Sequence, residues 1–221
     1  GSVARYRFRH TLFQQYLYDH LDPVRRTRLH EATGRALATL YEGRLDAIAA
    51  QLAYHFEAAG LMEPAVDYLL RAGRRAYRLS APAESVALYR HSLELLNDLP
   101  RSEACDRRKL NILLALEEAL MTMRGWGAPE RAASLGRAYR LGRDLGETEH
   151  LLPVLRALVS VHIARGEHRA ALDYAKQLLT LAQETSNALY IGIGKRMLGT
   201  GHMFLGHYAQ ACAYLKAGLR A

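Results

Sequence analysis

The chain has 221 residues, of which 50% are hydrophobic and 24% are charged, so it can bury a core and is not intrinsically disordered. It contains 38 Leu and 35 Ala but only 7 Val and 5 Ile, and this excess of helix formers leaves an all-β or doubly wound fold with little support. The formal charge is +8, with 26 Arg among the 30 basic residues. Each half of the chain, residues 1–110 and 111–221, has four more basic than acidic side chains, and this even spread argues against a dedicated nucleic-acid surface.

The sequence also bears on the compartment. No apolar run reaches the roughly 18 residues that a membrane span requires, and no signal peptide is visible. Cys105 and Cys212 lie far apart in sequence and form no disulfide framework. We therefore expect a cytoplasmic protein with no membrane contact. The start at Gly1-Ser2, without Met, is typical of an expression scar on a fragment of a longer protein.

Apolar periodicity predicts helices along almost the whole chain. Pro23, Pro64, Pro82 and Pro129 stand near predicted helix starts, where the missing N–H group costs nothing. In chain order, the predicted helices lie near Leu12–Leu21, Pro23–Tyr41, Leu45–Ala59, Glu63–Leu79, Ala83–Asn97, Glu103–Met123, Glu130–Leu145, Glu149–Arg165, Ala170–Thr185, Leu189–Leu205 and from Ala209 to the end.

The second half of the chain contains an internal repeat. A shift of 40 residues superimposes eight pairs of identical residues, and a similar frame recurs upstream. In each copy a Gly stands where a first helix must stop, since Gly adopts the left-handed C-cap conformation freely, and an Ala in the next helix lets two backbones approach closely. The frame is a helical hairpin, with copies at Leu52, Gly60, Ala65 and Tyr68, at Leu158, Gly166, Ala171 and Tyr174, and at Leu198, Gly206, Ala211 and Tyr214.

These hairpins resemble the tetratricopeptide repeat (TPR), and the best copy is Leu198-Gly199 followed by Gly206, Tyr208 and Ala211. The resemblance implies an all-α fold, a right-handed α-solenoid of antiparallel hairpins. The period of 40 exceeds the usual 34 residues, so longer helices are expected. His162 and His202 depart from the family, which prefers an aromatic residue there. Each is either a filler between the two helices or a metal ligand.

The first segment does not fit the repeat. Tyr6 to Tyr18 alternates and then becomes helical, which predicts a short strand entering a helix. It resembles the end of the winged-helix region in STAND-class signal-transduction ATPases, where a histidine opening this helix contacts nucleotide phosphates. His10 matches that position, and its alternative role is to cap the helix. Residues 24–100 look like the segment that joins such an ATPase to its repeats.

The stretch from Leu116 to Arg143 is similar to bacterial proteins that append these repeats to an ATPase, often with a nucleotide cyclase or transcription-factor domain. We therefore expect an expression scar at 1–2, the end of a winged-helix-like segment at 3–22, and linker helices with the first hairpins at 23–100. A truncated array of TPR-like repeats would occupy 101–221.

Sequence motifs for catalysis are absent. There is no GxxxxGK[ST] phosphate loop, HExxH, GxSxG or zinc-ligand spacing. We expect a non-enzyme that needs no cofactor and no metal.

Binding is expected on the concave face, which the first helix of each hairpin lines in such arrays. Arg156 and Arg196 recur there and either grip a carboxylate or phosphate or pair with neighbouring Glu. Trp126, the only Trp, either plugs its loop against the next hairpin or is an exposed recognition residue. The predicted concave positions are Tyr54, Glu57, Arg156, Ser160, Ile163, Arg196, Thr200, Met203 and Phe204.

Three functions follow from these observations. The leading one is a non-catalytic sensor that binds a protein, peptide or small effector and controls the attached ATPase of the parent protein. The second is a self-associating scaffold, because Tyr214, Leu215 and Leu219 would lack a covering helix. The third, less favoured, is nucleic-acid binding through the Arg excess.

Overall fold

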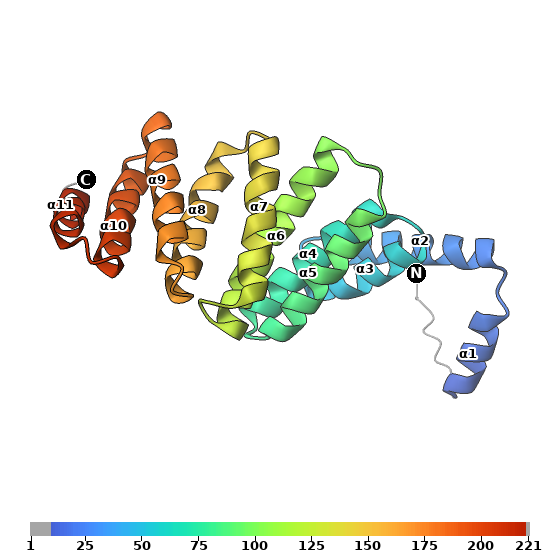
Figure 1. Cartoon of the computed structure of the whole chain (residues 1–221). Helices are drawn as coiled ribbons and strands as arrows, with labels where there is room; N and C mark the ends of the chain where they lie inside the picture. The colour runs from blue at the N-terminus through green and yellow to red at the C-terminus, as the bar shows by residue number, and fades with distance from the viewer. Residues whose placement is uncertain (1–9, 220–221) are drawn as a thin grey trace. The chain divides into compact units, whose positions relative to one another are not determined.

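The computed structural model describes residues 10–219, and throughout that range the regular structure is helical (Figure 1). Its elements are α1 (Thr11–Asp19), α2 (Pro23–Leu40), the short 3₁₀ helix η1 (Leu45–Ile48), α3 (Ala49–Ala58), α4 (Met62–Arg78), α5 (Pro82–Asn97), α6 (Glu103–Arg124), α7 (Pro129–Asp144), α8 (Thr148–Ala164), α9 (His168–Glu184), α10 (Ala188–Phe204) and α11 (Tyr208–Leu219). The chain divides into two units, residues 1–72 and 73–221, with the boundary inside α4.

The helix prediction is confirmed, and the helix limits fall close to those expected. The clearest difference is at Leu45–Ile48, where a 3₁₀ turn replaces the expected first turn of the third helix. Such turns are frequent at helix N-termini, where i to i+3 bonds satisfy free backbone groups. The strand expected before His10 lies outside the described residues.

In the first unit, α2 and α3 pack against each other around a small core. The Asp22 carboxylate accepts a hydrogen bond from the Arg25 backbone N–H, and Pro23 follows as the first helical residue, so α2 begins here as capping rules predict. Leu52 is fully buried in α3, and the Phe56 ring stacks on Tyr68 of α4 with ring centres 5.5 Å apart.

The second unit is a row of antiparallel helices. Consecutive helices from α5 to α11 contact one another, and α8 also contacts α10. Figure 1 shows α6 to α11 side by side in chain order. The turns within the α8–α9 and α10–α11 hairpins use Gly166 and Gly206, whose φ angles of 75° and 78° favour glycine. The sequence therefore placed these two turns correctly.

Equivalent residues of the repeat occupy equivalent places in the core. Leu158 and Leu198 are 1% and 2% exposed, and Ala171 and Ala211 are 0% and 4% exposed. Leu198 packs in one cluster with Ala171 and Val159, which belong to the preceding hairpin. Each hairpin therefore buries its apolar face against the next one, which is how a helical array is stabilised.

Candidate interaction surface

One face of α8 and α10 carries seven of the predicted binding residues, and we call this set the A-helix stripe: Arg156, Ser160 and Ile163 on α8 with Arg196, Thr200, Met203 and Phe204 on α10. The stripe lies opposite the most buried residues of α8, including Val154, Leu158 and Val161. Because α8 and α10 are in contact and 40 residues apart in register, equivalent stripe residues lie on neighbouring helices.

The two arginines of the stripe are exposed. Within residues 10–219, neither Arg156 nor Arg196 has a side-chain ion pair or hydrogen bond. Gly218 of α11 lies where a Cβ atom would approach Arg196 Cγ to 2.8 Å, so the arginine stem runs alongside α11. The alternative that these arginines pair with neighbouring glutamates is therefore wrong for the described residues.

The remaining stripe residues supply hydroxyls and apolar surface. Ser160 and Thr200 hydroxyls donate to the carbonyls of Arg156 and Arg196 at 3.1 and 3.0 Å. Met203 and Phe204 are 43% and 48% exposed, whereas Ile163 is half-buried against the core. Along each helix a cation is thus followed by a hydroxyl and then by an apolar side chain, a sequence of groups that suits an acidic ligand with an apolar part.

Tyr54 and Glu57 belong to α3 in the first unit. Tyr54 is 57% exposed, and its ring meets His30 edge-on with centres 5.5 Å apart. Glu57 is half-buried. These two residues therefore belong to a separate local surface, which has its own cluster of polar side chains.

That cluster was not foreseen from the sequence. The Tyr18 hydroxyl lies 2.9 Å from His30 Nε2, and His30 Nδ1 lies 3.0 Å from His55 Nδ1. Burial lowers the pKa of His30, and the positive charge of Arg26 lowers it further to a smaller extent. Burial also lowers the pKa of His55, with a smaller contribution from His30. Beside the cluster is a cavity of about 550 Å³ between α1, α2 and α3, with Tyr54 and His55 in its wall.

His10 stands immediately before α1, at its N-cap. Its side chain makes no capping hydrogen bond, and its ring centre is 6.1 Å from that of Phe13. His10 thus occupies the capping position of the alternative interpretation without a side-chain hydrogen bond, and its role toward a nucleotide in a longer protein stays a prediction.

His162 and His202 fill equivalent places between the helices of their hairpins. His162 stacks on Tyr174 and His202 on Tyr214, with ring centres 5.2 and 5.5 Å apart. His162 Nδ1 is 2.5 Å from Glu167, and His202 Nδ1 is 3.3 Å from His207. In the part of the chain that the structure describes, no three His, Cys, Asp or Glu side chains are grouped to hold a metal ion. The geometry fits the filler interpretation.

Trp126 is 57% exposed, which fits the exposed alternative and not a plug packed fully against the next hairpin. Its loop is instead held by Arg131, a side chain that is only 2% exposed and that pairs with Glu117. No sequence signal identifies this pair, because its members are 14 residues apart on different helices.

Comparison with known proteins identifies the fold. No family model matches the chain. An uncharacterized protein of Rhizobium meliloti (strain 1021), R02095, is 33% identical over 124 residues, which cover 55% of this chain and 12% of that relative.

Three solved structures are similar over most of this chain. RapI in its apo form has a TM-score of 0.63 at 14% identity, covering 80% of this chain and 51% of RapI. BtubC from P. vanneervenii has a TM-score of 0.62 at 13% identity, covering 90% and 91%. A Podosopora anserina protein described as a kinesin light chain with nearly identical TPR-like repeats has a TM-score of 0.58 at 16% identity, covering 91% and 96%.

The fold is a TPR-like helical solenoid. These likenesses confirm the predicted all-α solenoid of antiparallel hairpins, and at such low identity they concern the fold alone. A solenoid of this kind presents an extended surface along its row of helices. Among the described helices, none has both the length and the apolar character needed to cross a bilayer.

Proposed function

We propose that the chain is the non-catalytic sensor module of a STAND-type signalling ATPase, and that it captures an acidic protein segment, peptide or small effector on the A-helix stripe. The observation that carries this proposal is the pair Arg156 and Arg196. They occupy equivalent positions on neighbouring helices and have no acidic partner among residues 10–219. An exposed arginine without a carboxylate is available to bind one from outside.

The spacing of the stripe defines the ligand further. Packed helices lie about 8–10 Å apart, and an extended peptide advances about 3.3 Å per residue. Because side chains of an extended peptide alternate between two faces, two acidic side chains must be an even number of residues apart to face the stripe together. A separation of two residues, about 7 Å, lies within reach of the two long arginine side chains. Met203 and Phe204, about two turns from Arg196, supply the apolar contact.

Control of the attached ATPase follows from differential binding. A ligand that prefers one arrangement of the hairpins stabilises that arrangement and shifts the population of the resting and active states. His10 lies in the segment that resembles the end of a winged-helix domain. In the parent protein, the population shift would change the contact between His10 and the nucleotide phosphates. The parent protein is expected in a bacterial cytoplasm.

A peptide series tests the binding step. Dye-labelled octapeptides, each with two aspartates separated by one to five positions, are titrated with the chain and followed by fluorescence polarisation. The tightest binding is expected at a separation of two, where both carboxylates lie on the same face of the extended peptide. Arg156→Ala and Arg196→Ala should each lower the affinity about tenfold or more, because a hydrogen bond to a charged group contributes about 1.5–3 kcal/mol.

Arg140→Ala is the matched control, since Arg140 is exposed on α7 outside the stripe. Equal affinity in the stripe variants and the wild type would contradict the proposal. In the intact parent protein, the same peptide should change the rate of ATP hydrolysis, and the double stripe variant should remove that change.

Self-association is a second candidate function. Of the three apolar residues of α11 that suggest it, only one is largely exposed. Leu219 is 81% exposed. Leu215, however, packs against Gly199, and Tyr214 stacks on His202, so two of the three apolar residues are already covered by α10. Light scattering across a hundredfold concentration range decides the point: a constant monomer mass excludes the scaffold.

A further inference from the structure

The loop between α6 and α7 presents the chain's single Trp to solvent. Gly125 ends α6 with a φ of 85°, a left-handed conformation that favours glycine, and its N–H donates to the Met121 carbonyl. Trp126 follows and is 57% exposed. The indole therefore offers a large apolar surface with a polar N–H group to a partner.

The buried side chain of Arg131 holds the loop in one conformation. Arg131 Nη1 donates to the Trp126 carbonyl at 2.7 Å, and Arg131 Nε donates to Glu117 at 2.7 Å. The guanidinium carbon lies 5.5 Å from the indole centre. Burying an ion pair is costly, and here the pair fixes the backbone of a residue whose own side chain stays outside. The indole is thus oriented before any partner arrives.

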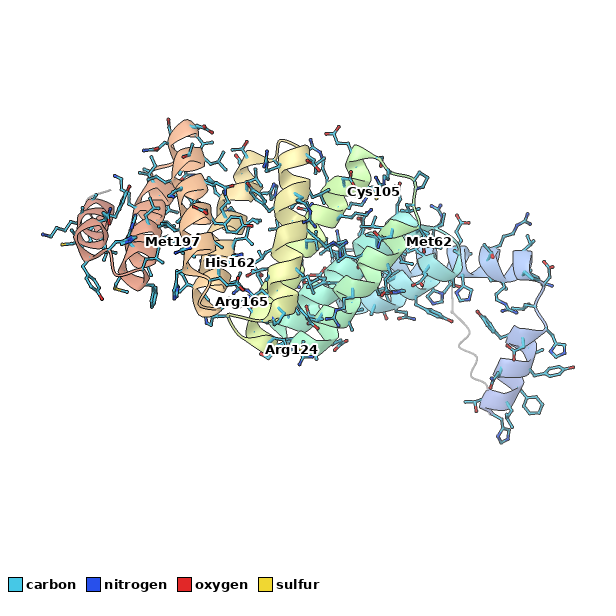
Figure 2. All side chains as sticks on the ribbon, in the orientation of Figure 1. Met62, Cys105, Arg124, His162, Arg165 and Met197 are labelled. Atoms are coloured by element: carbon cyan, nitrogen blue, oxygen red, sulfur yellow. The ribbon has the colours of Figure 1, made fainter. Side chains whose placement is uncertain are left out.

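The loop also rests on the neighbouring hairpin. A Cβ atom on Gly127 would lie 3.4 Å from the carbonyl oxygen of Ala164, the last residue of α8. Figure 2 shows Arg124, at the end of α6, and Arg165, just after α8, along the same lower edge of the helix row. The loop that carries Trp126 therefore contacts the end of α8 through Gly127.

The loop begins next to one arginine, Arg124, whose side chain has no carboxylate partner within residues 10–219. Three carboxylates of these helices and turns have an arginine partner: Glu117 pairs with Arg131, Glu130 with Arg90 at 3.0 Å, and Glu167 with Arg165 at 2.8 Å. Arg124 is exposed, and its side chain has no ion pair or hydrogen bond to any residue between 10 and 219. Arg124, two residues before Trp126 in the chain, therefore adds a positive charge at the start of this loop.

We propose that Trp126 and Arg124 form a second docking surface, separate from the A-helix stripe, for an acidic peptide segment with a large apolar side chain. The apolar side chain packs on the indole, and a neighbouring carboxylate pairs with Arg124. A rigid, exposed Trp is the kind of residue that dominates interface energies, because little conformational freedom is lost on binding.

The Trp itself reports on the site. Because the chain has one Trp, tryptophan fluorescence, excited at a wavelength that tyrosine does not absorb, monitors this loop alone. The probes are capped hexapeptides with a central phenylalanine flanked by glutamates, the same peptide with lysines in place of glutamates, and the glutamate peptide with alanine in place of phenylalanine. A saturable change in intensity or wavelength is expected with the first probe and at least tenfold weaker binding with the other two.

Variants separate this surface from the stripe. Arg124→Glu should weaken the response to the acidic probe at least tenfold, and Arg124→Lys should retain most of it. Arg140→Glu, the control for net charge, and the double variant Arg156→Ala/Arg196→Ala should respond as the wild type does. No response at millimolar probe, an equal response to the lysine probe, or loss of the response in the stripe variant each overturns the proposal. Loss of the response in the stripe variant would show that the acidic probe binds at the stripe.

Discussion

At the scale of single residues, Gly73 shows how close approach between helices depends on a missing side chain. Gly73 lies in α4, and a Cβ atom there would come within 2.3 Å of the Tyr89 ring of α5. Tyr89 is only 2% exposed and cannot move aside without disturbing the core. Gly136 in α7 is different, because a Cβ atom there would meet nothing within 4 Å.

These two glycines give opposite predictions for the same substitution. Gly73→Ala should lower the free energy of unfolding by about 1–3 kcal/mol through overpacking. Gly136→Ala should raise it by about 0.5–1 kcal/mol, since alanine is the better helix former and nothing obstructs it. Urea unfolding followed by circular dichroism measures both. Similar shifts of the same sign in the two variants would show that packing at Gly73 is not decisive.

At the scale of elements, the buried pair Arg131–Glu117 links α6 to α7 and anchors the loop between them. Arg131 is 2% exposed and the Glu117 side chain is 13% exposed. Arg90 and Glu130, by contrast, form an ion pair in which both side chains are about half exposed. A buried charge that loses its partner costs far more than an exposed one.

Arg131→Met should therefore destabilise the second unit by about 3–5 kcal/mol, whereas Arg90→Ala should change its stability by about 0–1 kcal/mol. Adding Glu117→Leu to Arg131→Met should recover much of the loss, because no unpaired charge then remains buried. Thermal unfolding gives the stabilities, and Trp126 fluorescence anisotropy reports whether the loop has become mobile. An Arg131→Met variant as stable as the wild type would mean that Glu117 is not buried as described.

At the scale of the whole molecule, two histidines make the stability of the first unit depend on pH. The first unit contains the hydrogen-bonded pair His30–His55, and both pKa values are lowered from the ordinary value of 6.5. Below that pH the unfolded chain binds more protons than the folded unit. The stability contributed by the pair is thus fully present above about pH 6.5 and is lost as the pH falls through the lowered values.

Acidification from pH 7.5 to 5.5 should therefore lower the unfolding temperature of the first unit, measured by differential scanning calorimetry. The double variant His30→Asn/His55→Asn should start less stable and show a flatter pH dependence. His20→Asn, which replaces an exposed histidine of the same unit, should keep the wild-type slope. A double variant with the wild-type slope would locate the pH dependence elsewhere.

The sequence by itself determined the elements and their repetition. Leu158, Gly166 and Ala171 recur 40 residues later because each hairpin buries the same face and turns at the same point, and such local requirements are written in residue spacing. The exposed positions of the A-helix stripe followed from the same periodicity.

The tertiary structure alone decided which side chains meet across helices. The pairing of Arg131 with Glu117, the contact of His30 with His55 and the exposure of Trp126 depend on how helices pack against one another. Packing is set by the shape of many side chains together, so it leaves no spacing signal in the chain. The sequence therefore showed where the helices and turns lie, and packing decided which charges remained available to a partner.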